Sequence, residues 1–213
     1  ASDTMYCVFI GKAVQTVTPA SGSVTNDMLA GSIANAKLAN SSVTVNGTSI
    51  SLGASGNISA GITEADQWRV TSNFTGDNNP IASNWERADG RGQGYFGTGM
   101  SQSSGVWTFP STGYWFVRFT LAYYASNSQS RTDISIRCSD NGTNFTEVAL
   151  AQIHAHYNPV AYQSGSTETI LDITDTSTHK VTFRNNDQDT SNTKLGSTDF
   201  NYTHVTFIRL GDT

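Results

Sequence analysis

The chain is poor in charge, cysteine and proline. Of its 213 residues, 14% are charged, four are proline and two are cysteine. The 12 basic residues are outnumbered by 17 acidic ones, which argues against nucleic acid as the main partner, because phosphate neutralisation needs clustered basic side chains. No apolar run approaches the roughly 20 residues of a membrane helix. Cys7 and Cys138 are too few for a secreted disulfide scaffold, and we expect both thiols to be unpaired.

Short polar residues fill much of the chain instead. Thr, Ser, Gly and Asn together make up 90 of the 213 residues. The 22 aromatic residues are too many for a disordered tail, which buries nothing. A threonine-rich composition with many turn residues predicts an all-β protein.

The aromatic residues divide the chain into regions of different character. Tyr6 and Phe9 lie near the start, and the next aromatic residue is Trp68. Residues 4–17 are rich in β-branched and aromatic types and predict one or two strands. Because strands need partners and none is predicted nearby, we interpret residues 1–20 as the end of a preceding β module. The chain is then expected to be the C-terminal piece of a longer protein.

Residues 22–60 carry a regular aliphatic stripe. Steps of four and five residues separate its members, which fits neither an isolated helix nor a strand. The stripe comprises Val24, Leu29, Ile33, Leu38 and Val43. Several identical chains wound together would pool such stripes into a thin core. A flexible linker is the alternative, although a linker has no reason to space aliphatics evenly. Around Asn46-Gly47 the pattern alternates as in a hairpin.

The C-terminal region predicts a compact β-sandwich or jelly roll. From Tyr114 to Leu121 the odd positions are all apolar and are expected to fill the core. The even positions begin apolar, which indicates a second burial surface such as a subunit contact. The predicted strands are 68–74, 106–109, 114–124, 132–138, 145–156, 168–173, 180–184 and 203–210.

Two stretches resemble known protein families. Residues 23–53, which include the near repeat Asp-Met-Leu-Ala and Ala-Lys-Leu-Ala, resemble the shaft repeats of bacteriophage tail fibres and related virion appendages. Residues 8–17 are similar to the strand that ends the small β module often found ahead of such a shaft. Residues 106–117 and 206–211 are similar to the entry and closing strands of C1q/TNF-like jelly rolls. The chain departs from that family at Trp115 and Val117, where Tyr and Phe usually alternate. Together the resemblances imply a homotrimer with a fibrous stem and an adhesive globular head.

No catalytic constellation stands out, so the chain is predicted not to be an enzyme and to need no cofactor. Glycoside hydrolysis needs two carboxylates about 5 to 10 Å apart, and no pair of acids in the head is marked by its spacing. The glycine-rich residues 90–99 are predicted to be a long, mobile β connection, since they lack the Lys of a phosphate cradle. His154 and His156 would share one face of a strand and are weak metal candidates. The polar clusters at 77–79 and 185–189 are interpreted as solvated turns rather than calcium sites.

Exposed aromatic residues are the better indication of a binding role. Sugars stack on aromatic rings, while Asn and Asp bond their hydroxyl groups, and loops on a rigid scaffold commonly carry recognition. The alternative is that some of these rings cap the core. The candidate receptor-binding residues are Trp85, Tyr95, Phe96, Tyr157 and Tyr162.

These observations predict an all-β chain in three parts. Residues 1–20 would end a β module, residues 21–65 would form a thin trimeric fibrous stem, and residues 66–213 a C1q/TNF-like jelly-roll head. The predicted function is that of a structural viral fibre, located in the virion after assembly in the host cytoplasm, that attaches to a bacterial surface receptor such as a glycan. Other virion proteins would bind the missing N-terminal part, and we expect no nucleic-acid partner and no insertion into a membrane. The alternatives are a head fibre or capsid decoration protein without a receptor role, and a polysaccharide-degrading spike.

Overall fold

The computed structural model describes residues 1–8, 11, 19–25, 28, 31, 33–35, 38–58, 61–125, 130–155 and 161–213. These residues form thirteen β-strands and no α-helix, which confirms the all-β prediction. The chain divides into two compact units, Ala1–Ile58 and Ser59–Thr213. Of the predicted strands over residues 4–17, the described residues 4–8 and 11 belong to no strand, and the remainder lies outside the described residues. A strand forms only against a partner, and the described part of the first unit offers these residues none.

The first unit contains the hairpin that the sequence predicts. Strands β1 (Ser42–Val45) and β2 (Thr48–Ser51) pair antiparallel. They are joined by Asn46 and Gly47, which both have positive φ, 47° and 73°, as a two-residue turn of the type I′ class requires. Four aliphatics of the stripe are exposed, Val24, Ile33, Leu38 and Val43, whereas Leu29 lies outside the described residues. The unit alone therefore leaves its aliphatic side chains in contact with water.

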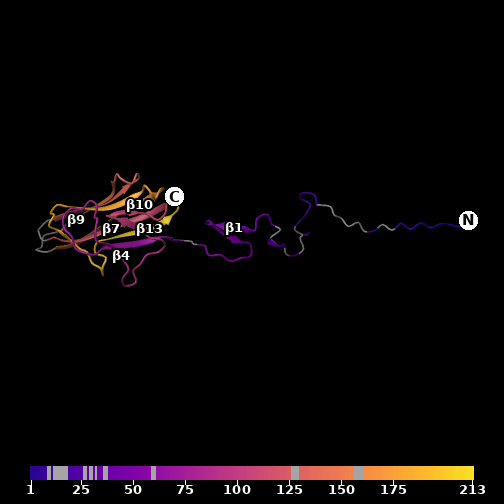
Figure 1. Cartoon of the computed structure of the whole chain (residues 1–213), viewed down its shortest axis with the longest axis horizontal. Coiled ribbons are helices and arrows are strands. Elements are labelled where there is room, and N and C mark those ends of the chain that lie inside the picture. Colours follow the sequence, from indigo (N-terminus) through magenta and orange to yellow (C-terminus); the bar gives the residue numbers. More distant parts are fainter. Residues whose placement is uncertain are drawn as a thin grey trace. The chain divides into compact units, whose positions relative to one another are not determined.

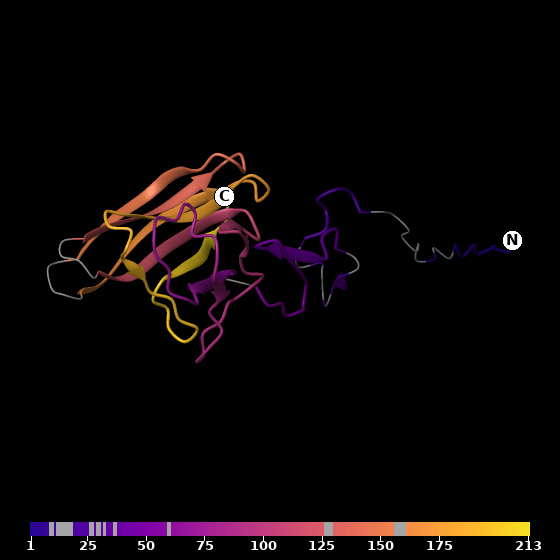
Figure 2. The same cartoon turned by 60° about the vertical axis from the view of Figure 1, so that its left-hand side comes forward.

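The second unit is a sandwich of two antiparallel sheets, seen as two layers in Figures 1 and 2. One sheet has the order β10-β7-β13-β3-β4, with β12 paired to β7, and the other has the order β5-β6-β11-β8-β9. The chain changes sheet between β4 and β5, β6 and β7, β7 and β8, β9 and β10, β10 and β11, and β11 and β12. This alternation is the jelly-roll topology that the sequence predicts.

Most long strands lie where the sequence predicts them, but the predicted strand 68–74 lies at 65–70 and the predicted strand 168–173 extends over 161–173. The six-stranded sheet contains β3 (Ala65–Val70), β4 (Trp85–Arg87), β7 (Gly113–Ala125), β10 (Ala161–Ile173), β12 (Thr193–Lys194) and β13 (His204–Gly211). The five-stranded sheet contains β5 (Ser101–Ser103), β6 (Val106–Thr108), β8 (Ser130–Ser139), β9 (Thr146–Ala155) and β11 (Lys180–Asp187). The short strands β4, β5 and β12 were not predicted, since two or three residues carry no readable periodicity.

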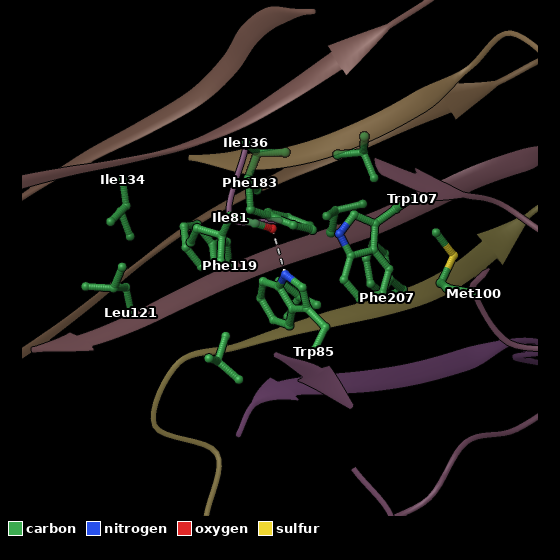
Figure 3. Packing of buried hydrophobic residues seen from close by; sticks show 14 of the residues in the cluster. Ile81, Trp85, Met100, Trp107, Phe119, Leu121, Ile134, Ile136, Phe183 and Phe207 are labelled. Atoms are coloured by element: carbon green, nitrogen blue, oxygen red, sulfur yellow. Dashed lines mark hydrogen bonds between the residues drawn. The ribbon is translucent and has the colours of Figure 1, made fainter. Parts of the chain in front are cut away.

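Aromatic rings from both sheets form the core, as Figure 3 shows. The fully buried Trp107 is its centre. It meets Trp68 edge-on, with ring centroids 5.1 Å apart, and Trp85 in the same way at 5.4 Å. Phe207 lies 5.3 Å away on the facing sheet. Such pairs add to the stabilisation from burying large rings.

Part of the opposite surface of the six-stranded sheet is left uncovered by the described residues. Side chains alternate along β7, so the odd positions fill the core as predicted and the even positions point outward. Eight outward side chains define a surface that we call the open face. They are Tyr114, Phe116, Arg118, Thr120, Glu168, Ile170, Thr206 and Ile208.

One end of the open face is apolar. Ile170 lies opposite Phe116, and Phe116 lies opposite Ile208 on its other side. The next strand places Ala65 opposite Ile208, at the point where the chain enters the sandwich. Ile170 is 59% exposed, which is unusual for an isoleucine on a regular sheet. The apolar start of the even face is therefore present as a partly exposed apolar row, and its burial in a subunit contact stays a prediction.

Candidate functional site

Trp85 is not a surface residue, so its expected place in an exposed loop is wrong. It begins β4 and is 8% exposed, and its indole Nε1 donates to the carbonyl of Ile81 at 2.8 Å. The preceding polar residues suggested a loop, but a three-residue strand follows and turns the ring inward against Trp107. Trp85 therefore serves the core.

Tyr95 and Phe96 line a surface cavity of about 500 Å³, which we call the Tyr95–Phe96 pocket. Their side chains are 52% and 59% exposed. The remaining lining residues come from β3, β13 and the glycine-rich loop: Ala65, Asp66, Gln67, Gly92, Gln93, Gly94, Thr206, Phe207 and Ile208. The pocket therefore borders the open face.

The ring of Tyr95 stacks on the arginine of an ion pair whose carboxylate is buried. Asp66 is 2% exposed and accepts hydrogen bonds from Arg87 Nε at 3.1 Å and from the Met100 amide at 2.7 Å. The Arg87 guanidinium lies between two rings, 4.1 Å from the centroid of Tyr95 and 4.9 Å from that of Trp68. This cation–π stack ties an exposed tyrosine to a buried carboxylate.

The glycine-rich loop is anchored, which corrects the expected mobile connection at residues 90–99. Phe96 and Ala65 exchange two backbone hydrogen bonds, at 2.8 and 3.0 Å. The Glu64 carboxylate accepts from the amides of Thr98, at 2.8 Å, and Gly99, at 3.0 Å. At Gly97 a Cβ would lie 2.4 Å from that carboxylate, and φ is 81°, so only glycine lets the loop approach so closely. Neither the residue type nor the spacing of Glu64 predicts this anchoring role.

The other wall of the pocket is held by Arg69, which is 2% exposed. Its guanidinium donates to Glu86 at 2.8 Å and to Gln93 at 2.8 Å, and contacts Asp89 at 3.3 Å. Gln93 belongs to the glycine-rich loop, so Arg69 fixes the loop against β3. Both sides of the pocket are therefore hydrogen-bonded to buried charged groups.

The polar groups that face the pocket suit a neutral, hydroxyl-rich ligand. Gln67 and Gln93 supply amides and Thr206 supplies a hydroxyl group, while Tyr95 and Phe96 supply ring faces. Asp66 lines the pocket, but its charge is balanced by Arg87. The sequence analysis did not single out Gln67, Gln93 or Thr206. The alternation along residues 65–70 does place Gln67 on the same face as Ala65, which is the one signal that would have found it.

Tyr162 lies apart from this pocket. It is 67% exposed on β10, at the other side of the sheet, three strand spacings or roughly 14 Å across from β3. Its ring lies 5.8 Å from that of Tyr124 and lines a second cavity of about 430 Å³ with Tyr202 and Asn201. The five predicted residues therefore do not form one site.

The remaining candidates take no part in either cavity. His154 is exposed on β9, and His156 and Tyr157 lie outside the described residues. The clusters at 77–79 and 185–189 meet, because Asp77 accepts from the Asp187 amide at 2.7 Å. Asn185 and Asp187 are buried, so for these two residues the expected solvated turn is wrong. In the part of the chain that the structure describes, no three His, Cys, Asp or Glu side chains gather as a metal site.

Both cysteines are free thiols, as expected. Burial raises the pKa of the Cys138 thiol above its usual range, and the nearby charge of Asp140 adds to the effect. The protonated thiol is then the prevailing form at neutral pH. Across the described residues, no helix is long and apolar enough to cross a bilayer.

Comparison with known proteins gives similarity at the level of whole structures. The chain matches no protein-family model and no curated protein sequence. Among solved structures it is similar to murine APRIL at pH 5.0, with 10% identity and a TM-score of 0.48 over 69% of this chain and 98% of that chain. It is also similar to Eiger TNF from S. frugiperda, with 11% identity and a TM-score of 0.48 over 72% of this chain and 96% of that one. The jelly-roll assignment rests on the strand order described above.

Proposed function

We propose that this chain belongs to a homotrimeric bacteriophage tail fibre, and that its jelly-roll head binds a glycan on the bacterial surface without cleaving it. The observation that carries the proposal is the Tyr95–Phe96 pocket, in which two exposed rings are held beside neutral amide and hydroxyl groups. Exposed rings beside amide groups can bind sugars, because the C–H faces of a sugar stack on the rings and its hydroxyl groups form hydrogen bonds with the amides. The resemblance of residues 23–53 to fibre shaft repeats supports the proposal that the protein is a fibre.

Two exposed apolar surfaces support self-association. In the first unit, Val24, Ile33, Leu38 and Val43 are each at least 40% exposed. In the second, the apolar row of the open face holds Ile170 next to Phe116 and Ile208. Burying these surfaces between copies gains roughly 25 cal/mol per Å² of apolar area. A threefold assembly would bury the aliphatic stripe of the first unit. Three copies of the stripe would enclose a thin apolar core, which one chain alone does not form.

The expected affinity of one pocket is low. Stacking on two rings and a few neutral hydrogen bonds give a dissociation constant on the order of micromolar to millimolar. Three heads on one fibre, and several fibres on one particle, then raise attachment through effective concentration by about 100-fold or more. Weak single sites that act together allow a particle to sample a surface before it is held firmly.

Binding of the intact chain to a panel of bacterial surface glycans tests this function. We expect Tyr95→Ala and Phe96→Ala to fold normally and to lose at least ten-fold in affinity. Tyr6→Ala, which removes an 86% exposed ring from the first unit, is the matched control and should bind as the parent does. Folded pocket variants that bind like the parent would overturn the assignment of this pocket.

Two further measurements separate the proposal from its alternatives. Release of sugar fragments from the bound polysaccharide would contradict binding without cleavage and would favour a polysaccharide-degrading spike. Labelling of virions with an antibody against this chain should mark the tail. Label confined to the capsid, with no glycan bound, would favour a head fibre or decoration protein.

A further inference from the structure

A lysine and an aspartate meet in the core of the sandwich with no access to water. Lys194 lies on β12, which pairs with β7 of the six-stranded sheet, and Asp187 ends β11 of the five-stranded sheet. Both side chains are 0% exposed, and the Lys194 Nζ contacts the Asp187 Oδ2. The contact therefore joins the two layers from inside.

Polar groups and one ring surround this pair. The Lys194 Nζ donates to the Asn192 carbonyl at 3.2 Å and lies 5.8 Å from the centroid of the Phe74 ring. The Asn185 amide nitrogen donates to Oδ1 of Asp187 at 3.5 Å. Burial raises the pKa of the Asp187 carboxyl, against the lowering effect of Lys194. An ion pair in such a place bears a large desolvation cost, which a neutral product would remove.

We propose that Lys194 and Asp187 condense spontaneously into an intramolecular isopeptide bond, between Nζ of the lysine and Cγ of the aspartate. The reacting groups are already in contact and shielded from water, which is the arrangement that gives intramolecular reactions effective concentrations on the order of 10⁵ M and above. Nothing in this inference depends on the glycan-binding function, so either proposal can fail alone.

The reaction balances within the pair. One proton passes from the ammonium to the carboxylate, leaving a neutral amine beside a carboxylic acid. The amine lone pair attacks Cγ, and the new C–N bond creates a tetrahedral centre whose oxygen faces the Asn185 amide. The nitrogen then gives a proton to the departing hydroxyl group, the C–O bond breaks, and water leaves. An ammonium and a carboxylate become an amide and water, with no oxidation or reduction and no change in net charge.

The isopeptide bond would change how the two sheets of the sandwich separate during unfolding. Residues 187–194 would become a covalent ring that ties β11 to β12, and therefore one sheet to the other. Two buried charges would be replaced by one neutral amide. Its N–H retains the Asn192 carbonyl as an acceptor, and its oxygen retains the Asn185 amide as a donor. A cross-link at this point resists separation of the layers.

Mass spectrometry of the intact, denatured full chain tests the proposal. We expect a mass lower than that of the sequence by one water molecule. Trypsin cuts after free lysine, and it should fail to cut after Lys194, leaving residues 185–209 as one water-depleted peptide. A chain of full mass that trypsin cuts after Lys194 would overturn the proposal, and this result needs no variant.

A variant and a chemical control identify the bond. Lys194→Arg cannot form the amide and should have the full mass; if it still lacks one water, the assignment to this pair is wrong. A cyclic imide at Asp89-Gly90 would also remove water, but that lesion lies in another tryptic peptide and reopens in alkali, whereas the isopeptide bond persists. Water loss that maps to Asp89 or disappears in alkali would equally overturn the proposal.

Discussion

The Arg87 guanidinium stacks on Tyr95 at 4.1 Å while its Nε donates to the buried carboxylate of Asp66 at 3.1 Å. One side chain thus connects an exposed ring of the pocket to the interior of the sandwich. Arg87 also donates to the Met100 carbonyl at 2.7 Å, so its position is fixed on three sides. The orientation of Tyr95 is consequently a property of the core and of the pocket at once.

Replacing Arg87 by lysine should therefore affect both stability and binding. Lysine keeps the positive charge but loses the planar fork that stacks and donates to several acceptors together. We expect Arg87→Lys to lower the free energy of unfolding by about 1 to 3 kcal/mol, since Asp66 stays buried with fewer donors. Glycan affinity should fall about five-fold or more as Tyr95 loses its support. Urea denaturation and a glycan titration measure the two effects.

Arg184→Lys is the matched control for this exchange. Arg184 pairs with Glu147 on the surface of the other sheet, where both side chains are about one third exposed. Exposed pairs contribute about 0 to 1 kcal/mol, so the control should unfold almost like the parent and bind equally well. Equal losses in the two variants would contradict the role given to Arg87.

The centre of the aromatic core makes a second prediction. Trp107 is fully buried, and among the described residues its indole nitrogen has no hydrogen-bond partner. Trp107→Ala removes the ring and should cost about 3 to 5 kcal/mol of unfolding free energy. Trp107→Phe keeps a ring and also removes the unpaired N–H, so its cost should be well below that of the alanine variant. Thermal or urea unfolding measures both, and similar costs for the two variants would show that the ring does not define this core.

The core and most of the long strands can be predicted from the sequence, because the patterns that indicate them lie within a few consecutive residues. Trp115, Val117 and Phe119 alternate with outward residues, and a period of two admits one arrangement when one face is buried. The turn at Asn46-Gly47 follows for the same reason, since its conformation depends on those two residues. Trp85 could not be placed in this way, because the strand that turns it inward is three residues long.

The candidate site was less predictable because its parts are distant in the sequence. Tyr95 and Phe96 were identified by residue type, but the pocket also needs Gln67 and Thr206, which β3 and β13 bring together by pairing. The anchoring of the loop by Glu64 depends on a contact across more than thirty residues. Composition and spacing report neither pairing partners nor the contacts of a single carboxylate.

Stability should depend on pH through His204 on the outward side of β13. Burial lowers the pKa of its imidazole below the ordinary value of 6.5, and the positive charge of Arg118 adds to the lowering. The unfolded chain then binds a proton more readily than the folded chain between the two pKa values. Stability is therefore lost as pH falls below about 6.5, with a slope of at most about 1.4 kcal/mol per pH unit.

Unfolding measured from pH 7.5 to pH 5 checks this dependence. His204→Gln should flatten the curve over that range, because the neutral amide does not titrate. His154→Gln, on the exposed side of β9, is the control and should leave the slope as it is. A parent slope that survives in His204→Gln would assign the pH dependence to other groups.

The last prediction concerns the assembly. Light scattering of the intact chain should give three times the 22.8 kDa of one copy. Ile170→Glu places a carboxylate in the apolar row beside Phe116 and Ile208, where association would bury it without a partner. We expect this variant to dissociate at concentrations at least ten-fold higher than the parent does.

Leu150→Glu tests whether the effect belongs to the open face. Leu150 is 51% exposed on β9 of the other sheet, so the exchange adds the same charge at a similar exposure on the opposite surface. Because the open face is the one surface of the second unit that we assign to subunit contact, Leu150→Glu should remain a trimer at every concentration at which the parent does. A folded, monomeric parent would contradict the homotrimer directly. If the parent is a trimer and the Ile170→Glu and Leu150→Glu trimers dissociate to the same degree, the dissociation would result from the added charge in general. The open face would then not be the subunit contact.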